Sequence, residues 1–537
     1  MFPGQDRLIP RLPSGRPDVN RHPFDFLRLA CALLAFFSAP VLLCAVLFLF
    51  DLPLSPYFLV GSFVALGFYY LRKPFDPVGS GVALALVGSA FFLSGLSLDT
   101  SWDGLAYHQA AIMHLAEGVN PVLDRFTDLM GKWTNAYPKA SWYFSSVVYR
   151  VTGDIQYGKA YHLLLLFAAL AYGQHVFREQ GLVARALAAL ACLNPVALCQ
   201  VPSFYVDGAL ASLMAICLLY LWKWSSGKDG FARQEHVLFV MSLIVLANLK
   251  FTGLVYATMT ALWVLGCAWR QSRARAAEIL RRVLLPAAAG VLLVGCSPYV
   301  THLLEGKHLF HPVAGADKTD IISRIAPRGF AEMNRLEKLG RSLAARTGFA
   351  SATRSPVLKA PFAVSADELT AMDGPDVRVG GFGPLFSGIL VVSLGVGLVW
   401  RAGLNPWVLS LLAAMTLVNA EAWWARLAPF LWLLPLFLVS GYRTPRLACW
   451  TVLLLLSANV LLSGVSIALS AQRETAALHE LLSAHTGSRC WIRNSYFTFR
   501  PTLERYGIIE EPGERHRDDD WPCPELLYEA EVCCMPE

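Results

Sequence analysis

Long apolar runs separated by short polar segments dominate this chain of 537 residues. A helix needs about 20 apolar residues to cross roughly 30 Å of hydrocarbon, and many of the runs approach or exceed that length. Hydrophobic residues make up 55% of the chain and charged residues only 16%, well below the content of soluble domains. The ten-residue alternating segments of a membrane barrel are absent. The sequence therefore predicts an all-α polytopic membrane protein with about thirteen transmembrane helices.

The positions of the basic residues give an orientation. Lys and Arg collect in cytoplasmic loops, and five arginines come before or open the first apolar run: Arg7, Arg11, Arg16, Arg21 and Arg28. Counting spans from a cytoplasmic N-terminus places the basic segment 270–282 inside. The same count places two long polar loops outside, residues 99–157 (the first loop) and 301–383 (the second loop). A wrong span count would reverse the later loops, so the charges support the count.

These spans divide the chain into four expected parts. Residues 1–26 form a cytoplasmic N-terminal segment, 27–77 a transmembrane hairpin, 78–470 the main transmembrane module, and 471–537 an external tail. The net charge of +6 is spread over many short loops, which indicates membrane topology and no nucleic-acid partner. We expect a bacterial inner-membrane protein whose outer loops and tail are periplasmic, with external loops that carry short helices.

Four of the 12 cysteines crowd the polar tail: Cys490, Cys523, Cys533 and Cys534. Disulfides persist in an oxidising compartment such as the periplasm, so these four are disulfide candidates. Four cysteines allow three pairings, and the sequence does not choose among them. The neighbours Cys533 and Cys534 are expected to bond to different partners. A zinc site is the alternative, although the spacing lacks paired Cys-x-x-Cys motifs.

The polar side chains that this topology brings to the outer surface include both acids and cations. Acids at the end of a membrane span are costly and are functional candidates by default. The candidate residues are Asp99, Asp103, Tyr107, His108, Tyr205, Asp207, Lys250 and Arg426. Cations suit a lipid-linked phosphate, and a carboxylate suits a base that deprotonates an acceptor hydroxyl or amine. A divalent ion bridging carboxylates and phosphate fits the same set.

Short motifs on this surface resemble the GT-C superfamily of polytopic glycosyltransferases. The resemblance is to the members that use polyprenyl-phosphate sugars, such as lipid A aminoarabinose transferases and protein mannosyltransferases. The motifs are Trp102-Asp103-Gly104-Leu105-Ala106-Tyr107-His108, Gly118-Val119-Asn120-Pro121, Phe204-Tyr205-Val206-Asp207-Gly208, Asn248-Leu249-Lys250 and Trp424-Ala425-Arg426. The likeness covers about 78–441. The family's Asp-Glu pair is replaced by Asp103-Gly104, and Asp99 is a candidate for the second acidic role.

The resemblance implies roles for individual residues. Asp103 would be the general base that deprotonates the acceptor, which attacks the anomeric carbon with inversion as the lipid phosphate leaves. Lys250 and Arg426 would hold the donor phosphate, and the other substrate-binding candidates are Asp99, Tyr107, His108 and Tyr205. Asp103 and Asp207 would ligate a divalent metal (Mg, Mn or Ca) if one is used. The partners would be a polyprenyl-phosphate-linked sugar donor, a glycan, lipid or protein acceptor, and the bilayer.

Simpler interpretations remain open for these residues. Asp103 and Asp207 also suit helix N-caps, and Lys250 and Arg426 also suit anchors at the membrane interface. Trp423 and Trp424 are interpreted as part of an aromatic belt. The alternative functions are a transporter or flippase for lipid-linked saccharides, or a polymerase or ligase of such saccharides. A transporter favours polar groups at midspan and internal repeats, whereas here the polar groups gather at span ends.

Overall fold

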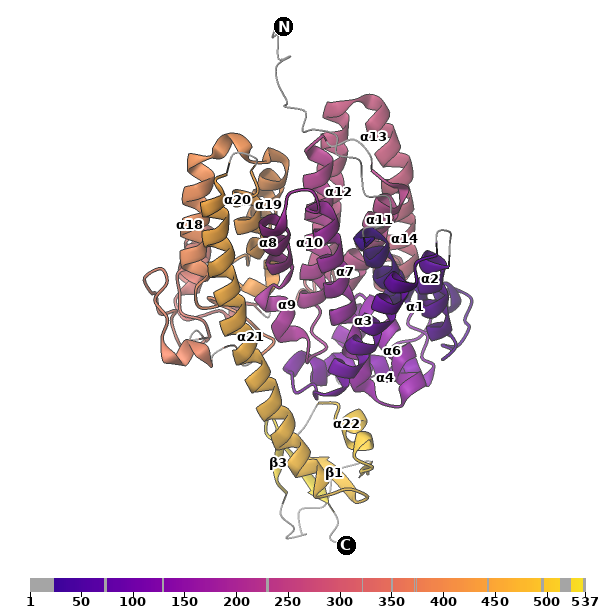
Figure 1. Ribbon diagram of the computed structural model, residues 1–537. Coiled ribbons are helices and arrows are strands. Elements are labelled where there is room, and N and C mark those ends of the chain that lie inside the picture. The colour runs from indigo at the N-terminus through magenta and orange to yellow at the C-terminus, as the bar shows by residue number, and fades with distance from the viewer. Residues whose placement is uncertain are drawn as a thin grey trace, which may run out of the picture.

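The computed structural model describes residues 24–71, 75–127, 130–227, 231–320, 322–348, 351–370, 372, 374–441, 444–493, 497–511 and 523–534. The predicted N-terminal segment 1–26 lies, up to residue 23, outside the described residues. Within them the chain is mostly helical with a few short strands near its C-terminus (Figure 1). The prediction of an essentially helical protein is therefore confirmed.

Five helices are long and apolar enough to cross a membrane: α1 (Phe26–Leu49), α3 (Pro77–Gly95), α10 (Asp207–Ser225), α12 (Phe251–Gln271) and α21 (Arg446–Ser483). A bent pair, Arg273–Val294 with Cys296–Leu304, makes six if it counts as one span, and its two parts meet at 80°. Several helices thus have the length and composition of membrane spans. The predicted number of about thirteen transmembrane helices is larger than these five or six, and it would be reached only by counting shorter helices as well.

Shorter apolar helices accompany the long ones. They include α2 (Phe58–Tyr70), α8 (Leu182–Cys192), α18 (Phe386–Val399), α19 (Pro406–Val418) and the segment Pro429–Val439, which contains α20 (Leu434–Val439). The other α-helices are α4 (Gln109–Glu117), α5 (Gly131–Ala136), α6 (Ala140–Thr152), α7 (Tyr161–Val176), α9 (Pro195–Gln200), α11 (Arg233–Leu249), α13 (Arg273–Ile279), α14 (Leu285–Val294), α15 (Thr301–Leu304), α16 (Ile322–Ile325), α17 (Arg335–Leu343) and α22 (Arg500–Arg505). Both long loops therefore carry short helices.

The core of the bundle is aromatic and aliphatic. Asp25 caps the N-terminus of α1, because its side chain accepts a hydrogen bond from the Arg28 amide. Phe37 of α1 is fully buried and packs against Phe144 of α6 and Tyr161 of α7, with ring centroids 5.1 and 6.3 Å apart. The aromatic side chains of α1 thus join the N-terminal hairpin to the first loop and to α7.

A small disulfide-bonded module follows α21. It contains a four-stranded sheet in the order β2-β1-β4-β3, formed by β1 (Arg489–Arg493), β2 (Ile509–Glu510), β3 (Glu525–Leu527) and β4 (Ala530–Cys534). Cys490 of β1 is bonded to Cys534, and Cys523 is bonded to Cys533. The two neighbouring cysteines thus bond to different partners, and the zinc alternative loses its thiolates. We call residues 484–534, as far as they are described, the C-terminal module.

The two ends of the bundle differ in what they carry (Figure 1). Helices α4 and α6 of the first loop lie at the same end as the C-terminal module, and α21 runs without a break from the bundle to the start of that module. Helix α13, in the middle of the basic segment 270–282, lies at the opposite end. The bundle therefore separates the most basic segment from the first loop and the C-terminal module.

Candidate functional site

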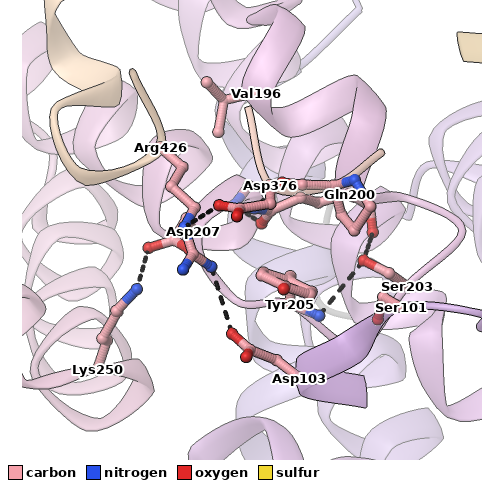
Figure 2. A network of polar contacts seen from close by, with 12 residues as sticks. Ser101, Asp103, Val196, Gln200, Ser203, Tyr205, Asp207, Lys250, Asp376 and Arg426 are labelled. Carbon is pink, nitrogen blue, oxygen red and sulfur yellow. Dashed lines mark hydrogen bonds and ion pairs between the residues drawn. The ribbon is translucent and has the colours of Figure 1, made fainter. Parts of the chain in front are cut away.

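Arg426 lies at the centre of a cluster of charged side chains from distant parts of the chain (Figure 2). One guanidinium nitrogen, Nη1, lies 3.3 Å from Asp103 Oδ2 and 3.6 Å from Asp207 Oδ2. The Nε atom lies 2.9 Å from Asp376 Oδ1. Lys250 Nζ donates a hydrogen bond of 2.6 Å to Asp207 Oδ1. The structure therefore brings together four predicted residues, namely Asp103, Asp207, Lys250 and Arg426, and adds Asp376.

Each of the four predicted members of the cluster lies at a helix end or in a short helical turn. Asp103 directly precedes the π-helical turn Gly104–His108. Such turns are rare in proteins, and those that occur are often found at functional sites. Asp207 is the first residue of α10. Lys250 is the single extended residue between α11 and α12, with φ −159°. Arg426 lies in the short 3-10 turn Ala425–Leu427. No long helix has to be interrupted at its middle to build the site.

Asp376 and Arg378 of the second loop are members of the cluster that the sequence did not reveal. The backbone amides of Ala425 and Arg426 donate hydrogen bonds of 3.1 and 3.2 Å to the carbonyls of Arg378 and Val377. This pairing holds the two chain segments side by side, and Arg378 Nη2 lies 2.8 Å from Asp376 Oδ2. An acid and an arginine two residues apart in a long loop carry no distinctive signal in sequence.

Aromatic rings cover the faces of the Arg426 guanidinium. Its carbon atom lies 4.8 Å from the ring centroids of both Tyr205 and Trp424, a cation–π arrangement. Arg378 lies 5.1 Å from the same Trp424 ring. Trp423 and Trp424 are 2% and 1% exposed, so the interpretation as an aromatic belt is wrong. Trp424 instead supports two cations of the site, because its ring is enclosed beneath the second loop.

The cluster is a partly enclosed ion network, in which the side chains of Asp103 and Asp376 are 21% and 27% exposed. Asp103, Asp207 and Asp376 face Lys250, Arg378 and Arg426, and the Arg426 side chain is 12% exposed. Burial raises the pKa of Asp103 above its ordinary value, although Arg426 opposes the shift. Burial also disfavours charge on Arg426, but the surrounding carboxylates outweigh it and hold its pKa well above the usual value. Arg426 therefore stays charged, while Asp103 binds a proton more readily than an exposed carboxyl group.

Some polar atoms of the cluster have hydrogen-bonding capacity to spare. Asp207 Oδ2, Asp376 Oδ1 and Arg426 Nε are buried and make no hydrogen bond, although each lies near an opposite charge. Buried polar atoms normally have such partners, and exceptions call for an explanation. Arg426 Nε and Asp376 Oδ1 lie 2.9 Å apart and balance each other's charge, whereas Asp207 Oδ2 lies 3.6 Å from Arg426 Nη1 and can accept a further hydrogen bond.

Asp99 has a different role from Asp103. Its carboxylate accepts hydrogen bonds from the amides of Ser101 (2.9 Å) and Phe204 (2.9 Å), and the residue is 1% exposed. It therefore ties the start of the first loop to the turn before Asp207. A side chain at Gly104 would begin 2.0 Å from Asp99 Oδ2, so Asp99 fills the space that a larger residue at 104 would need. The contacts of Asp99 are those of a positioning residue.

Tyr107 and His108 lie behind the cluster. Trp142 Nε1 donates a hydrogen bond of 2.7 Å to His108 Nδ1, and His108 is 1% exposed. Burial lowers the pKa of His108 well below its ordinary value, and the neighbouring Lys250 adds to the shift. Tyr107 packs at a tilt against His108 and Tyr137, with ring centroids 4.4 and 5.6 Å away. A neutral, enclosed His108 supports the wall of the site.

The arrangement does not fit a divalent metal shared by Asp103 and Asp207. Carboxylate oxygens are suitable ligands for Mg²⁺, Mn²⁺ or Ca²⁺. However, Arg426 Nη1 lies between the two carboxylates, and Lys250 holds the second oxygen of Asp207. Among the described residues, the compact group of three possible ligands is Cys523, Glu531 and Cys533, whose cysteines are joined in a disulfide. Cations of the protein itself therefore balance the acids of the site.

Comparisons of the whole chain give no match among protein-family models, curated proteins or solved structures.

Proposed function

We propose that the protein is a membrane glycosyltransferase of the GT-C type. It would move a sugar from a polyprenyl-phosphate donor to an acceptor at the outer face of the membrane. One observation carries the proposal: Asp103, Asp207, Lys250 and Arg426, which lie up to 323 residues apart, form one ion network. A carboxylate of raised pKa beside fixed cations is what base-assisted transfer from a phosphate leaving group requires.

Asp103 is the general base of this mechanism. It accepts the proton of the acceptor hydroxyl or amine as that group attacks the anomeric carbon. The new glycosidic bond forms as the bond from the anomeric carbon to the phosphate oxygen breaks, and the configuration inverts. The electron pair leaves with the polyprenyl phosphate, and the proton stays on Asp103 until solvent takes it. Tyr205, which is buried with its ring against the Arg426 guanidinium, keeps this cation in place.

Arg426 and Lys250 stabilise the leaving phosphate. A guanidinium has five N–H donors, and the contacts with the three carboxylates are made by Nη1 and Nε of Arg426. Arg426 can therefore donate to a phosphate oxygen and keep at least one carboxylate contact. Lys250, 15% exposed in its side chain, supplies the second positive charge. The phosphate then carries its added charge where cations are already fixed, which lowers the barrier.

The topology that we propose for this activity has about thirteen spans, with the N-terminus in the cytoplasm and the C-terminal module outside. Each of the long apolar helices and the shorter ones of 10–17 residues would cross or enter the bilayer. Two disulfides in the C-terminal module support an oxidising compartment, such as the periplasm of a bacterium. The basic helix α13 at the opposite end supports the cytoplasmic side.

The competing functions make less use of the site. A transporter or flippase requires polar groups along a path through the bilayer. The cluster described here stands instead at helix ends, with its carboxylates paired to cations. A polymerase or ligase of lipid-linked saccharides remains an enzyme of related chemistry, but it would not depend on Asp103.

The activity is tested with purified protein and a panel of polyprenyl-phosphate sugars that differ in the sugar. Mass spectrometry follows the release of polyprenyl phosphate, and proteoliposomes loaded with the same donors report movement across the bilayer. We expect release that depends on an added envelope acceptor and is faster than lipid translocation. Translocation without any cleavage of the donor would contradict the proposal and favour a flippase.

The pH dependence of transfer follows from the environment of Asp103. A base must be unprotonated, so activity is lost as the pH falls through the pKa of this carboxyl group. Because burial raises that pKa, we expect the acidic limb of kcat/KM to have its midpoint above the ordinary value of about 4. Initial rates between pH 4 and 8 measure the limb. A midpoint at or below about 4 would exclude Asp103 as a buried base.

A further inference from the structure

The C-terminal module contacts the stretch of the first loop that carries Asp103. The Tyr528 hydroxyl donates a hydrogen bond of 2.9 Å to the Thr100 carbonyl. The rings of Phe497 and Tyr528 pack edge-on against Trp102, with centroids 4.7 and 5.5 Å away. The Thr498 amide donates a 2.9 Å hydrogen bond to the carbonyl of Leu105. Residues on both sides of Asp103 are thus held by the same module.

Helix α21 contacts the beginning of the same first-loop stretch, at Leu98 and Thr100. The Leu98 amide donates a hydrogen bond of 3.3 Å to Thr475 Oγ1. Thr100 Oγ1 donates one of 2.5 Å to Glu474 Oε2. Since the C-terminal module follows α21 directly, these contacts fix the module relative to the first loop (Figure 1).

Further polar contacts fasten the module to the flanks of the first loop. Arg505 donates to the Gly95 carbonyl at 2.9 Å and pairs with Asp154 at 3.2 Å. Arg500 pairs with Glu117 at 3.0 Å, and the Tyr149 hydroxyl donates to Glu504 at 2.9 Å. The module is therefore docked across the whole first loop and not at one point alone.

The hairpin that carries Tyr528 is strained at its tip. Tyr528 and Glu529 have φ angles of 52° and 66°, in the left-handed region that residues other than Gly and Asn rarely adopt. The disulfide Cys523–Cys533 joins the two sides of this hairpin, and Cys490–Cys534 joins it to β1. Strain of this kind persists only where the surroundings fix the backbone, and it is common at functional positions. Here it presents the Tyr528 side chain to Thr100 and Trp102.

We propose that the C-terminal module is the positioning element of the site, with Tyr528 as its principal positioning residue. Tyr528 and Phe497 hold Trp102, and through it they hold Asp103 at its distance of 3.3 Å from Arg426. The catalytic consequence rests on the proposed function, whereas the structural consequence does not. A shift of about 1 Å in a reacting group is enough to reduce a rate by about a hundredfold.

Hydrogen–deuterium exchange of the full-length protein tests the structural part. We expect Tyr528→Ala to speed exchange of the amides in 98–105 by about tenfold, because a hydrogen bond and an aromatic contact are lost. Tyr528→Phe, which removes only the hydroxyl, should give about a threefold increase. The control is Arg489→Ala, which breaks an exposed ion pair with Glu511 elsewhere in the same module and should leave 98–105 unchanged.

The peptide 489–493 reports in the same experiment whether the module itself has opened. If exchange in 489–493 shows that Tyr528→Ala unfolds the C-terminal module, the exchange of 98–105 in Tyr528→Phe alone decides whether Tyr528 positions the first loop. Unchanged exchange in 98–105 for the deciding variant overturns the proposal, whatever the activity of the protein.

The kinetic part uses the transfer assay. We expect kcat of Tyr528→Phe to fall while KM for the donor stays within about twofold, because the displaced group acts on the acceptor. A wild-type protein without transfer activity would refute the proposed function and leave the exchange result standing. A rise in KM for the donor of more than about twofold, without a fall in kcat, would assign Tyr528 to substrate binding and overturn the positioning role.

Discussion

Replacing Asp103 with Asn is expected to reduce the rate of sugar transfer by about a thousandfold, within the range that a general base contributes. Asn keeps the size of the side chain and an oxygen that can still accept from Arg426, 3.3 Å away. It cannot take a proton from the acceptor. The fold should survive, because Arg426 retains its contacts with Asp207 and Asp376. The measurement is the initial rate of polyprenyl phosphate release at saturating donor.

The matched control is Asp124→Asn, an exposed carboxylate in the same first loop. Asp124 Oδ2 accepts a hydrogen bond from the Asn120 amide and lies outside the ion network. Its loss should change the rate less than twofold. A transfer rate of Asp103→Asn close to that of the Asp124→Asn control would remove Asp103 from the chemistry and favour a polymerase or ligase that uses other residues.

The helical character of the protein could be predicted from the sequence because lipid leaves few alternatives. Apolar runs such as 27–50 and 208–224 must satisfy their backbone hydrogen bonds internally, and the structure has α1 and α10 there. Hydropathy does not give the lengths as reliably. The apolar run 186–200 is long enough to suggest one span, yet it is divided into α8 and α9, because Asn194 and Pro195 begin a new helix.

Part of the site could be predicted because its residues lie at helix ends. The positive-inside rule assigns ends to sides, so Asp103, Asp207, Lys250 and Arg426 could be placed on one surface before any contact was known. The contacts between them are then set by how the helices pack. Asp376 could not be predicted, because backbone pairing with residues 425–426 brings it into place from an irregular loop. The roles of Trp424 and Asp99 were missed for a related reason, since both depend on burial beneath distant segments.

Replacing Arg426 with Gln is expected to destabilise the protein by about 3–5 kcal/mol, as removal of one partner of a buried ion pair does. Three carboxylates surround this guanidinium, and the Asp207 side chain is 2% exposed. Lys250 and Arg378 would then face three acids alone. The midpoint of thermal unfolding in detergent should fall by several degrees. Transfer activity should fall as well, because the leaving phosphate loses its main cation.

Two further variants separate this effect from the loss of any surface charge. Arg341→Gln breaks an exposed pair with Glu337, whose side chains are 45% and 42% exposed, and should cost less than about 1 kcal/mol. Adding Asp376→Asn to Arg426→Gln removes one of the stranded carboxylates and should restore part of the lost stability, because the two residues share a contact of 2.9 Å. The stability should recover further than the activity does, since only the stability depends on balancing the acids, whereas transfer also needs the cation itself. Equal unfolding midpoints for Arg426→Gln and Arg341→Gln would mean that the carboxylates are solvated, and the partly enclosed ion network on which the proposed function depends would not exist.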